Sequence, residues 1–88
     1  MTEFRISYDR HADVLYVTTS RNGPAHAKEG DDGIIWRYLD TDDTLVGVTI
    51  MDFSEYWKPR ISELAKQVSL HFHVPRTQAA AVLERANV

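Results

Sequence analysis

The sequence predicts an α+β fold in which a small antiparallel sheet of about four strands is followed by two C-terminal helices that pack on one face. Three observations predict this fold. Apolar and β-branched residues alternate with polar ones as far as about residue 54, which is the pattern of half-buried strands. From about residue 58 the apolar spacing becomes that of a helix. Clusters of glycine, asparagine and aspartate separate the segments, as turns require.

The chain is short, with 88 residues, and its 43% hydrophobic content is ordinary for a globular protein. We therefore expect a single domain over residues 1–88, with a sheet at about 3–54 and a helical tail at about 58–87. The chain contains no cysteine, so disulfide bonds and thiolate metal sites are excluded. The sequence has no signal-peptide pattern and no apolar run of membrane-spanning length. A cytoplasmic protein that makes no membrane contact is expected.

Four segments have the character of β-strands, at residues 4–8, 14–19, 34–39 and 45–53. Residues 25–28 have the length of a short edge strand but few of the residues that favour one. A hairpin loop is predicted between the last two strands. The alternation places apolar residues of the first and last strands on the face that a helix would cover: Phe4, Ile6, Tyr8, Val46, Val48 and Ile50.

Two amphipathic helices are predicted after the sheet. Pro59 suits the entry to the first helix and Pro75 the start of the second, because a first helical turn leaves its N–H groups unpaired anyway. Each helix has apolar residues at the spacing of a single face, so each is expected to bury one stripe. The two stripes are Ile61, Leu64, Ala65 and Val68, and then Ala79, Val82, Leu83 and Ala86.

The second face of the sheet carries apolar residues that one amphipathic helix cannot also cover. Met51 and Phe53 alternate away from the covered face of the last strand, and Trp36 and Tyr38 share a face of the strand before it. A surplus apolar face of this kind usually marks an interface. The alternative is that the second helix or the loop at 20–33 covers it. The candidate interface residues are Tyr16, Trp36, Tyr38, Met51, Phe53 and Trp57.

Charge is divided unevenly along the chain, whose formal net charge is −3. Residues 1–57 carry eleven acidic and five basic side chains, whereas residues 58–88 carry two acidic and five basic ones. An acidic sheet region suits a small basic protein partner and repels nucleic acid; plain solvation of two unlike surfaces is the alternative. The helices resemble a helix-turn-helix only in outline, because the connector is long and contains Pro75. DNA binding is therefore not expected.

Candidate catalytic and metal-binding residues are few. His71 and His73 have the spacing of two metal ligands on one side of an extended segment. The alternative is two exposed histidines in a linker, since a third ligand would have to come from elsewhere. The loop with Asp40, Asp42 and Asp43 lacks the glycine and the distal glutamate of a calcium loop. The sequence has no nucleophile elbow and no phosphate loop. It therefore predicts no catalytic residue, no metal and no cofactor, and favours a non-enzymatic protein.

Three stretches of the chain, taken together, carry a family resemblance. They are Tyr8-Asp9-x-x-Ala12-Asp13-x-Leu15-Tyr16-Val17, then Asp32-Gly33-Ile34-Ile35, and then Asp40-x-Asp42-x-x-Leu45-Val46-Gly47-Val48-x-Ile50-x-Asp52. In this order they resemble the small bacterial domain-of-unknown-function family 2283, over roughly residues 4–55. The motif positions in this chain are Tyr8, Asp9, Ala12, Asp13, Leu15, Tyr16, Gly33, Gly47 and Asp52.

The resemblance implies a compact antiparallel sheet and no established activity. Members of the family are thought to sit beside small toxin-like proteins, which implies an antitoxin-like or partner-binding role.

The motif residues also have a structural interpretation of their own. Asp9 and Asp13 flank a tight turn, where a carboxylate accepts backbone N–H groups. Tyr8 and Tyr16 lie on neighbouring strands and are expected to pair across them. Gly47, inside a strand, predicts a bulge or the close approach of another backbone. None of these features requires catalysis.

Two functional hypotheses of different classes follow. The first is a non-enzymatic protein-interaction module, antitoxin-like in its most specific form, that forms a homodimer or holds a small basic protein partner. The second is a small-ligand-binding or enzymatic domain with a site near Trp36, Tyr56 and Trp57. Aromatic side chains anchor an interface under the first hypothesis and stack on a ligand under the second.

Overall fold

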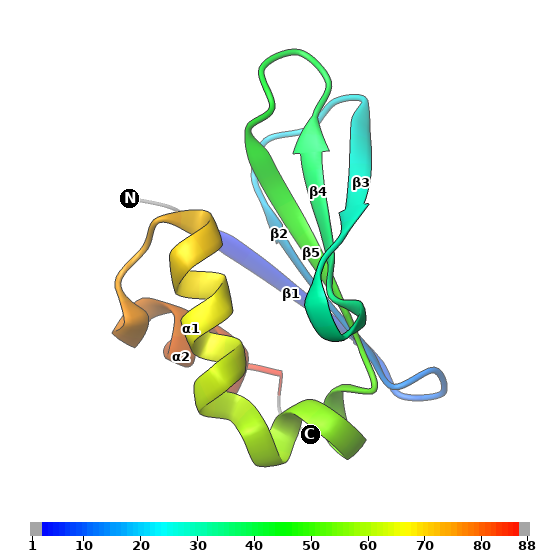
Figure 1. The fold of residues 1–88 in the computed structure, drawn as a ribbon, viewed down its shortest axis with the longest axis vertical. Helices are drawn as coiled ribbons and strands as arrows, with labels where there is room; N and C mark the ends of the chain where they lie inside the picture. Colours follow the sequence, from blue (N-terminus) through cyan, green and yellow to red (C-terminus); the bar gives the residue numbers. More distant parts are fainter. Residues whose placement is uncertain (1–2, 87–88) are drawn as a thin grey trace.

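A computed structural model describes residues 3–86 of the chain and confirms the α+β class. One sheet has both helices on the same side of it (Figure 1). The sheet has five antiparallel strands in the order β1-β2-β5-β4-β3. Their bounds are β1 (Phe4–Asp9), β2 (Val14–Thr19), β3 (Ala25–Glu29), β4 (Ile35–Leu39) and β5 (Leu45–Met51). The C-terminal helices are α1 (Ile61–Phe72) and α2 (Arg76–Glu84).

Strand β5 lies at the centre of the sheet. It pairs with β2 on one side and with β4 on the other, so it joins the β1–β2 hairpin to the β3–β4 pair. Its residues Val46, Val48 and Ile50 are buried on the face that the helices cover. The alternation in the sequence predicted this face because side chains of a strand point to opposite sides in turn.

The number of strands differs from the prediction of about four, because β3 is a full member of the sheet. It pairs with β4 over its whole length, with Lys28 opposite Trp36 and His26 opposite Tyr38. Its alanine, lysine and glutamate residues have low strand propensity. Pairing with a neighbouring strand overrides this propensity, which is why the sequence pattern indicated β3 only faintly.

The last strand ends earlier than predicted, at Met51 rather than at residue 53. Asp52 adopts a left-handed conformation, with φ 55° and ψ 42°, and the chain then enters a π-helical turn, η2 (Phe53–Trp57). The alternation of the strand therefore stops before Phe53. Instead of lying on the face opposite the helices, Phe53 turns into the core and is only 2% exposed.

The two helices follow the predicted stripes closely. A short 3-10 turn, Lys58–Arg60, contains Pro59 and leads into α1. Helix α1 runs further than its apolar stripe and takes in His71, and the left-handed His73 (φ 56°) caps its C-terminal end. The expected end of the tail at residue 87 lies outside the described residues. Within residues 3–86 no helix is long and apolar enough to cross a membrane.

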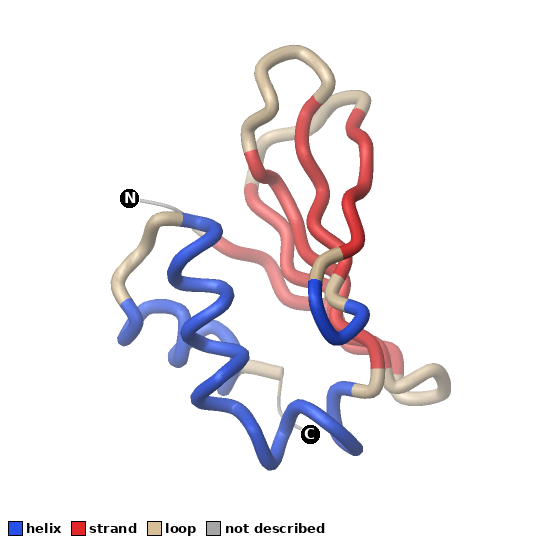
Figure 2. Tube along the Cα trace, in the orientation of Figure 1, coloured by secondary structure: helices blue, strands red, loops and turns tan. Residues whose placement is uncertain are grey.

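One hydrophobic core joins the helices to one face of the sheet. The buried cluster combines Leu15, Val17 and Val48 of the sheet with Leu64 and Val68 of α1, among others. Edge-on contact of the Phe4 and Phe72 rings, whose centroids are 5.1 Å apart, ties β1 to the end of α1. The helices form a second layer beside the strands (Figure 2).

No helix of residues 3–86 lies over the opposite side of the sheet, and we call this side the open face. Alternation and strand register place on it the side chains that point away from the core. Its apolar side chains are Val14, Tyr16, Ile35 and Met51, with the polar Thr49 between them. Of the residues that the sequence assigned to a surplus apolar face, Tyr16 and Met51 lie on the open face, and Trp36, Phe53 and Trp57 are buried in the core.

Two leucines of α1 provide a test of which helix face packs on the sheet. Leu64 is fully buried, whereas Leu70 is 60% exposed. We expect Leu64→Ala to lower the free energy of unfolding by about 2–4 kcal/mol, because it leaves a cavity in the core. Leu70→Ala, the matched control, should change it by no more than about 0.5 kcal/mol. Urea denaturation followed by tryptophan fluorescence measures both, and equal effects would contradict the packing.

Candidate functional site

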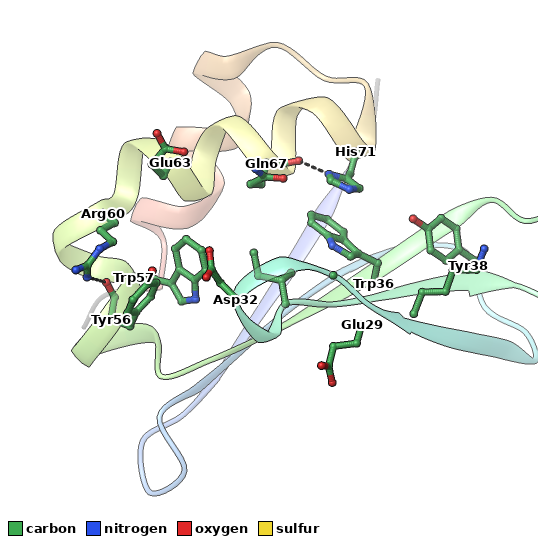
Figure 3. Close-up of a pocket in the computed structure, with 13 residues that line it drawn as sticks. Glu29, Asp32, Trp36, Tyr38, Tyr56, Trp57, Arg60, Glu63, Gln67 and His71 are labelled. Atoms are coloured by element: carbon green, nitrogen blue, oxygen red, sulfur yellow. Dashed lines mark hydrogen bonds between the residues drawn. The ribbon is translucent and has the colours of Figure 1, made fainter.

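A cleft of about 500 Å³ lies between the β3–β4 edge of the sheet and the helical segment from η2 into α1. Its volume lies in the range of small-molecule sites. Aromatic and charged side chains from both layers point towards it (Figure 3). We call it the aromatic cleft. The side chains that define it are Lys28, Trp36, Tyr38, Tyr56, Trp57, Arg60, Glu63 and His71.

One wall of the aromatic cleft is a stacked pair of rings. The His71 imidazole lies parallel to the Trp36 indole, with ring centroids 3.8 Å apart and an interplanar angle of 9°. His71 Nδ1 lies 2.9 Å from the backbone oxygen of Gln67. Because a carbonyl only accepts, Nδ1 must carry the proton in this bond. The ring is therefore fixed both by stacking and by a hydrogen bond within its own helix.

The opposite wall is built by the turn that leads into α1. The Arg60 guanidinium lies 4.2 Å from the centroid of the Tyr56 ring, and Arg60 Nη1 donates a 2.8 Å hydrogen bond to the Tyr56 backbone oxygen. Tyr56 in turn meets the edge of Trp57, with centroids 4.9 Å apart. Cation–π contact and the hydrogen bond together hold the guanidinium in place at the mouth of the cleft.

The floor of the aromatic cleft depends on a glycine. A side chain at Gly30 would bring its Cβ within 2.8 Å of Trp36 Nε1, which is closer than van der Waals contact allows. The Gly30 amide donates a 2.7 Å hydrogen bond to the Ile34 oxygen and so closes the small loop beside β3. The loop can therefore pass over the indole only because residue 30 has no side chain.

The three aromatic residues of the second hypothesis, Trp36, Tyr56 and Trp57, all line this cleft. Trp36 and Trp57 are buried, whereas Tyr56 is 37% exposed. Sequence analysis did not single out Lys28, Arg60 or His71 as members of the site. Arg60 lies four residues after Tyr56 and His71 four after Gln67. This four-residue spacing, which places two side chains on one face of a helix, can be seen in the sequence. It could not be assigned to the cleft, because the sequence did not predict where the helix and the strands lie relative to each other.

The charges of the aromatic cleft are mixed in sign and lie at its rim. Lys28 and Arg60 are basic, and Asp32 and Glu63 are acidic, and all of them are exposed. Lys28 Nζ lies 5.4 Å from the centroid of the Tyr38 ring. Such a cleft can stack a flat apolar group against its rings and hold a polar group at its rim.

A second feature lies at the turn end of the sheet, where Asp13 joins three segments. Its carboxylate accepts hydrogen bonds from the Tyr8 hydroxyl at 2.6 Å, the Ser54 amide at 2.9 Å and the Glu55 amide at 3.3 Å. Its backbone oxygen accepts a 3.0 Å bond from the Phe53 amide. Asp13 thus attaches the β1–β2 turn to the start of η2.

The hydrogen bonds around Asp13 change the acidity of both partners. Burial acts to raise the pKa of Asp13, but the bonds from Tyr8, Ser54 and Glu55 outweigh it and hold that pKa below its ordinary value. The bond to the Asp13 carboxylate raises the pKa of Tyr8. The charged form of Asp13 is therefore the one that the fold stabilises.

The other motif residues have structural roles as well. Asp9 accepts the amides of His11 at 3.0 Å and Ala12 at 3.2 Å, as predicted for a turn carboxylate. The predicted irregularity at Gly47 is confirmed, because the β4–β5 register shifts immediately beside its pairing with Arg37. Leu15 is fully buried. Gly33 and Asp52 have positive φ angles of 78° and 55°, which turn the chain before β4 and after β5.

The predicted pairing of Tyr8 with Tyr16 is wrong. Tyr8 lies opposite Leu15 and Ser7 lies opposite Tyr16. Residues that face each other across a hairpin share a side of the sheet, so a shift of one residue reverses the side. Tyr8 therefore faces the helices, where it bonds Asp13, and Tyr16 lies on the open face.

The six candidate interface residues do not share one surface. Tyr16 and Met51 lie on the open face, where they are 39% and 40% exposed. Trp36, Phe53 and Trp57 are buried in the core, and Tyr38 is half-buried on the helix-facing side. The alternation alone left the side of Trp36 and Tyr38 undetermined, because it does not fix the strand register.

The two histidines of the candidate metal pair are placed differently from the extended linker that their spacing suggested. His71 lies in the last turn of α1 and stacks on Trp36, whereas His73 is the exposed cap of that helix. Within residues 3–86 no group of three or more histidine, aspartate or glutamate side chains is arranged to hold a metal ion. On α2, Arg76 donates to the Ser62 oxygen at 3.4 Å, which directs its side chain to α1.

Comparison with known proteins gives one match. The model of a family described as "Protein of unknown function (DUF2283)" matches residues 5–54. The matched region covers the five strands apart from Phe4, the first residue of β1, and ends at Ser54, whose amide donates to Asp13. Both helices follow it. No curated protein and no solved structure matches the chain.

The lowered pKa of Asp13 predicts a pH-dependent contribution to stability. Because the folded pKa lies below the ordinary 3.8, Asp13 stabilises the fold at pH values above about 4, and this contribution disappears as the pH falls through the folded pKa. We expect Asp13→Asn to lower the free energy of unfolding at pH 7 by about 1–2 kcal/mol. The gap between Asp13→Asn and the unmodified chain should narrow below pH 4.

Urea unfolding at a series of pH values measures this effect. Asp32→Asn is the matched control, because Asp32 has the same left-handed φ of 57° and is exposed. Asp32→Asn should not lower the free energy of unfolding at pH 7, and its difference from the unmodified chain should not change below pH 4. Equal behaviour of the two variants would contradict the role of Asp13.

Proposed function

Given that the chain belongs to the DUF2283 family of proteins of unknown function, we propose that it is a non-enzymatic protein-interaction module that binds through the open face of its sheet. The observation that carries this proposal is that both helices lie on one side of the sheet and leave the other side bare (Figure 1). An exposed apolar sheet face of this kind is typical of an interface.

The exposed apolar residues support the open face as the binding surface. Among residues 3–86, Tyr16 and Met51 are two of the four large apolar side chains that are exposed, with Tyr56 and Leu70. They lie on the neighbouring strands β2 and β5, beside the half-buried Val14. Tyrosine anchors interfaces well because it buries a large rigid surface and still has a hydroxyl to pair.

The partner that we propose is a second copy of the chain or a small basic protein, with an antitoxin-like role as the most specific form. Acidic side chains support a basic partner, because they lie exposed at both ends of the sheet. Asp40 and Asp43 lie in the β4–β5 loop, and Asp52 and Glu55 follow β5. A basic protein that spans the face would meet both ends.

Substitution of Tyr16 tests the interaction surface. Any stoichiometric partner that co-purifies with the tagged full chain is identified, purified, and titrated back by calorimetry. We expect Tyr16→Lys to weaken its binding by about tenfold or more, because a charge replaces an apolar anchor. Leu70→Lys, an exposed leucine on α1, is the control and should bind as the unmodified chain does. Equal affinities of all three proteins would count against the open face.

A second function is favoured by a specific observation, the aromatic cleft. It gathers Trp36, Tyr56 and Trp57 in one hollow with Arg60 at its mouth. Under this second proposal the cleft binds a small flat ligand with a polar substituent. Binding of such a ligand to the folded chain alone would raise its thermal stability.

A thermal-shift screen of metabolites tests this second function. We expect a true ligand to raise the melting temperature by about 5 °C or more at saturation. Tyr56→Ala should abolish the shift. Tyr16→Ala removes an equally exposed tyrosine from the opposite side and should keep it. A screen without any shift, or a shift that survives Tyr56→Ala, would contradict a ligand site in the cleft.

A further inference from the structure

Basic side chains gather around one shallow depression on the side of the sheet away from the helices. Residues 1–57 hold five basic side chains against eleven acidic ones. Three of those five, Arg5, Arg21 and Arg37, line a depression of about 130 Å³ at one end of the open face. No acidic side chain of residues 3–86 lines it. The acidic part of the chain thus contains a local basic site.

The strand register places two of these arginines at the ends of one cross-strand row. Arg5 on β1 lies opposite Thr18 on β2. Gly47 on β5 is next in the row and pairs with Thr18 on one side and with Arg37 on the other. Neighbouring strands lie about 4.8 Å apart, so the two arginines start about 14 Å from each other. Their side chains can lean inwards from both ends and contact a single anion over the middle of the row.

Gly47 keeps the middle of this row low. A Cβ at this position would lie 3.5 Å from Thr18 Cγ2 and 3.9 Å from the Arg37 Cβ. Any side chain here would therefore fill the space between those two residues. The glycine leaves a floor on which an anion can lie close to the backbone of the sheet.

Arg21, in the loop after β2, forms a third side of the depression, and its guanidinium is held in place. Arg21 Nη1 donates to Thr44 Oγ1 at 3.2 Å, and Arg21 Nη2 donates to Asp42 Oδ2 at 3.2 Å. These bonds use two of the five N–H donors of a guanidinium and leave the others for a ligand. Asp42 offsets part of the charge of Arg21, but it does not line the depression.

Arg5 and Arg37, by contrast, are not paired within the chain. Neither makes an ion pair, a side-chain hydrogen bond or a cation–π contact in the part of the chain that the structure describes. Both are exposed, and an arginine keeps its charge at every pH that a folded protein meets. Like charges that line one depression repel each other. An anion bound between them would remove this repulsion.

We propose that this depression binds a tetrahedral oxyanion, either inorganic phosphate or the phosphate group of a small monoester. Guanidinium groups bind phosphate well, because their N–H donors match its oxygens in pairs and both partners are charged. The donors come from β1, from β4 and from the loop after β2, which suits a tetrahedral anion better than a planar carboxylate. This site does not depend on the proposed interaction role, since neither Tyr16 nor Met51 lines it.

Titration of the isotope-labelled full chain with inorganic phosphate tests the site by nuclear magnetic resonance. At constant ionic strength we expect saturable shifts of the Gly47 amide and of the Arg5 and Arg37 side-chain N–H signals, with a dissociation constant of about 1 mM. Acetate should bind at least about tenfold more weakly. Glycerol phosphate separates the two sources of the phosphate group. Tighter binding than that of inorganic phosphate indicates a monoester, and equal or weaker binding indicates the free ion.

Substitution of single arginines distinguishes a site from general attraction. Arg5→Gln and Arg37→Gln should each weaken phosphate binding by about tenfold, because each removes a charged hydrogen-bond donor. Arg10→Gln is the matched control: it removes the same charge from an exposed arginine in the β1–β2 turn, at the other end of β1, and should leave the affinity unchanged.

Two results would overturn the phosphate site. One is a set of shifts that do not saturate by about 50 mM phosphate, and the other is an equal loss of affinity in Arg10→Gln and Arg37→Gln. Circular dichroism of each variant confirms that weaker binding does not reflect loss of the fold.

Discussion

Two short helices have to supply the apolar cover for a five-stranded sheet, and they have enough surface for one of its faces only. Every other feature follows from this constraint. The covered face holds Leu15, Val17, Val48 and Ile50 under α1 and forms the core. Where the cover ends beside the β3–β4 edge, a gap remains and becomes the aromatic cleft. The face without cover keeps Tyr16 exposed, and burying it requires another molecule.

Asp13 joins the part of the chain that the family model describes to the part that it does not. The match ends at residue 54, and the Asp13 carboxylate binds the amides of Ser54 and Glu55. The start of η2 is thereby fixed on the sheet, and with it the direction in which α1 leaves. Tyr8 of β1 and Asp13 of the turn thus fix the point at which the chain leaves the sheet for the helices.

Alternation in the sequence was sufficient to predict the covered face, since Val46, Val48 and Ile50 follow the period of a strand without interruption. It failed at Phe53, because the left-handed Asp52 ends β5 at Met51, two residues earlier than predicted. Sequence patterns alone also do not encode register, which is why Tyr8 and Tyr16 were assigned to one side. The aromatic cleft gathers residues from β3, β4, η2 and α1. Three of its aromatic residues, Trp36, Tyr56 and Trp57, were predicted as members of a ligand site because aromatic rings can stack on a ligand. Its charged rim was not predicted, because it depends on how the helices pack against the sheet.

We infer that the open face is bare in the single chain and covered when a partner binds. The most direct measurement is nuclear magnetic resonance with a soluble paramagnetic probe, at low and at high protein concentration. If a second copy covers the face, we expect the Met51 methyl to be broadened in dilute solution and to become protected on concentration, while the exposed Leu70 methyls stay broadened throughout. Protection of Met51 at every concentration would mean that the chain covers this face itself. Equal broadening of Met51 and Leu70 at every concentration would mean that no second copy binds there.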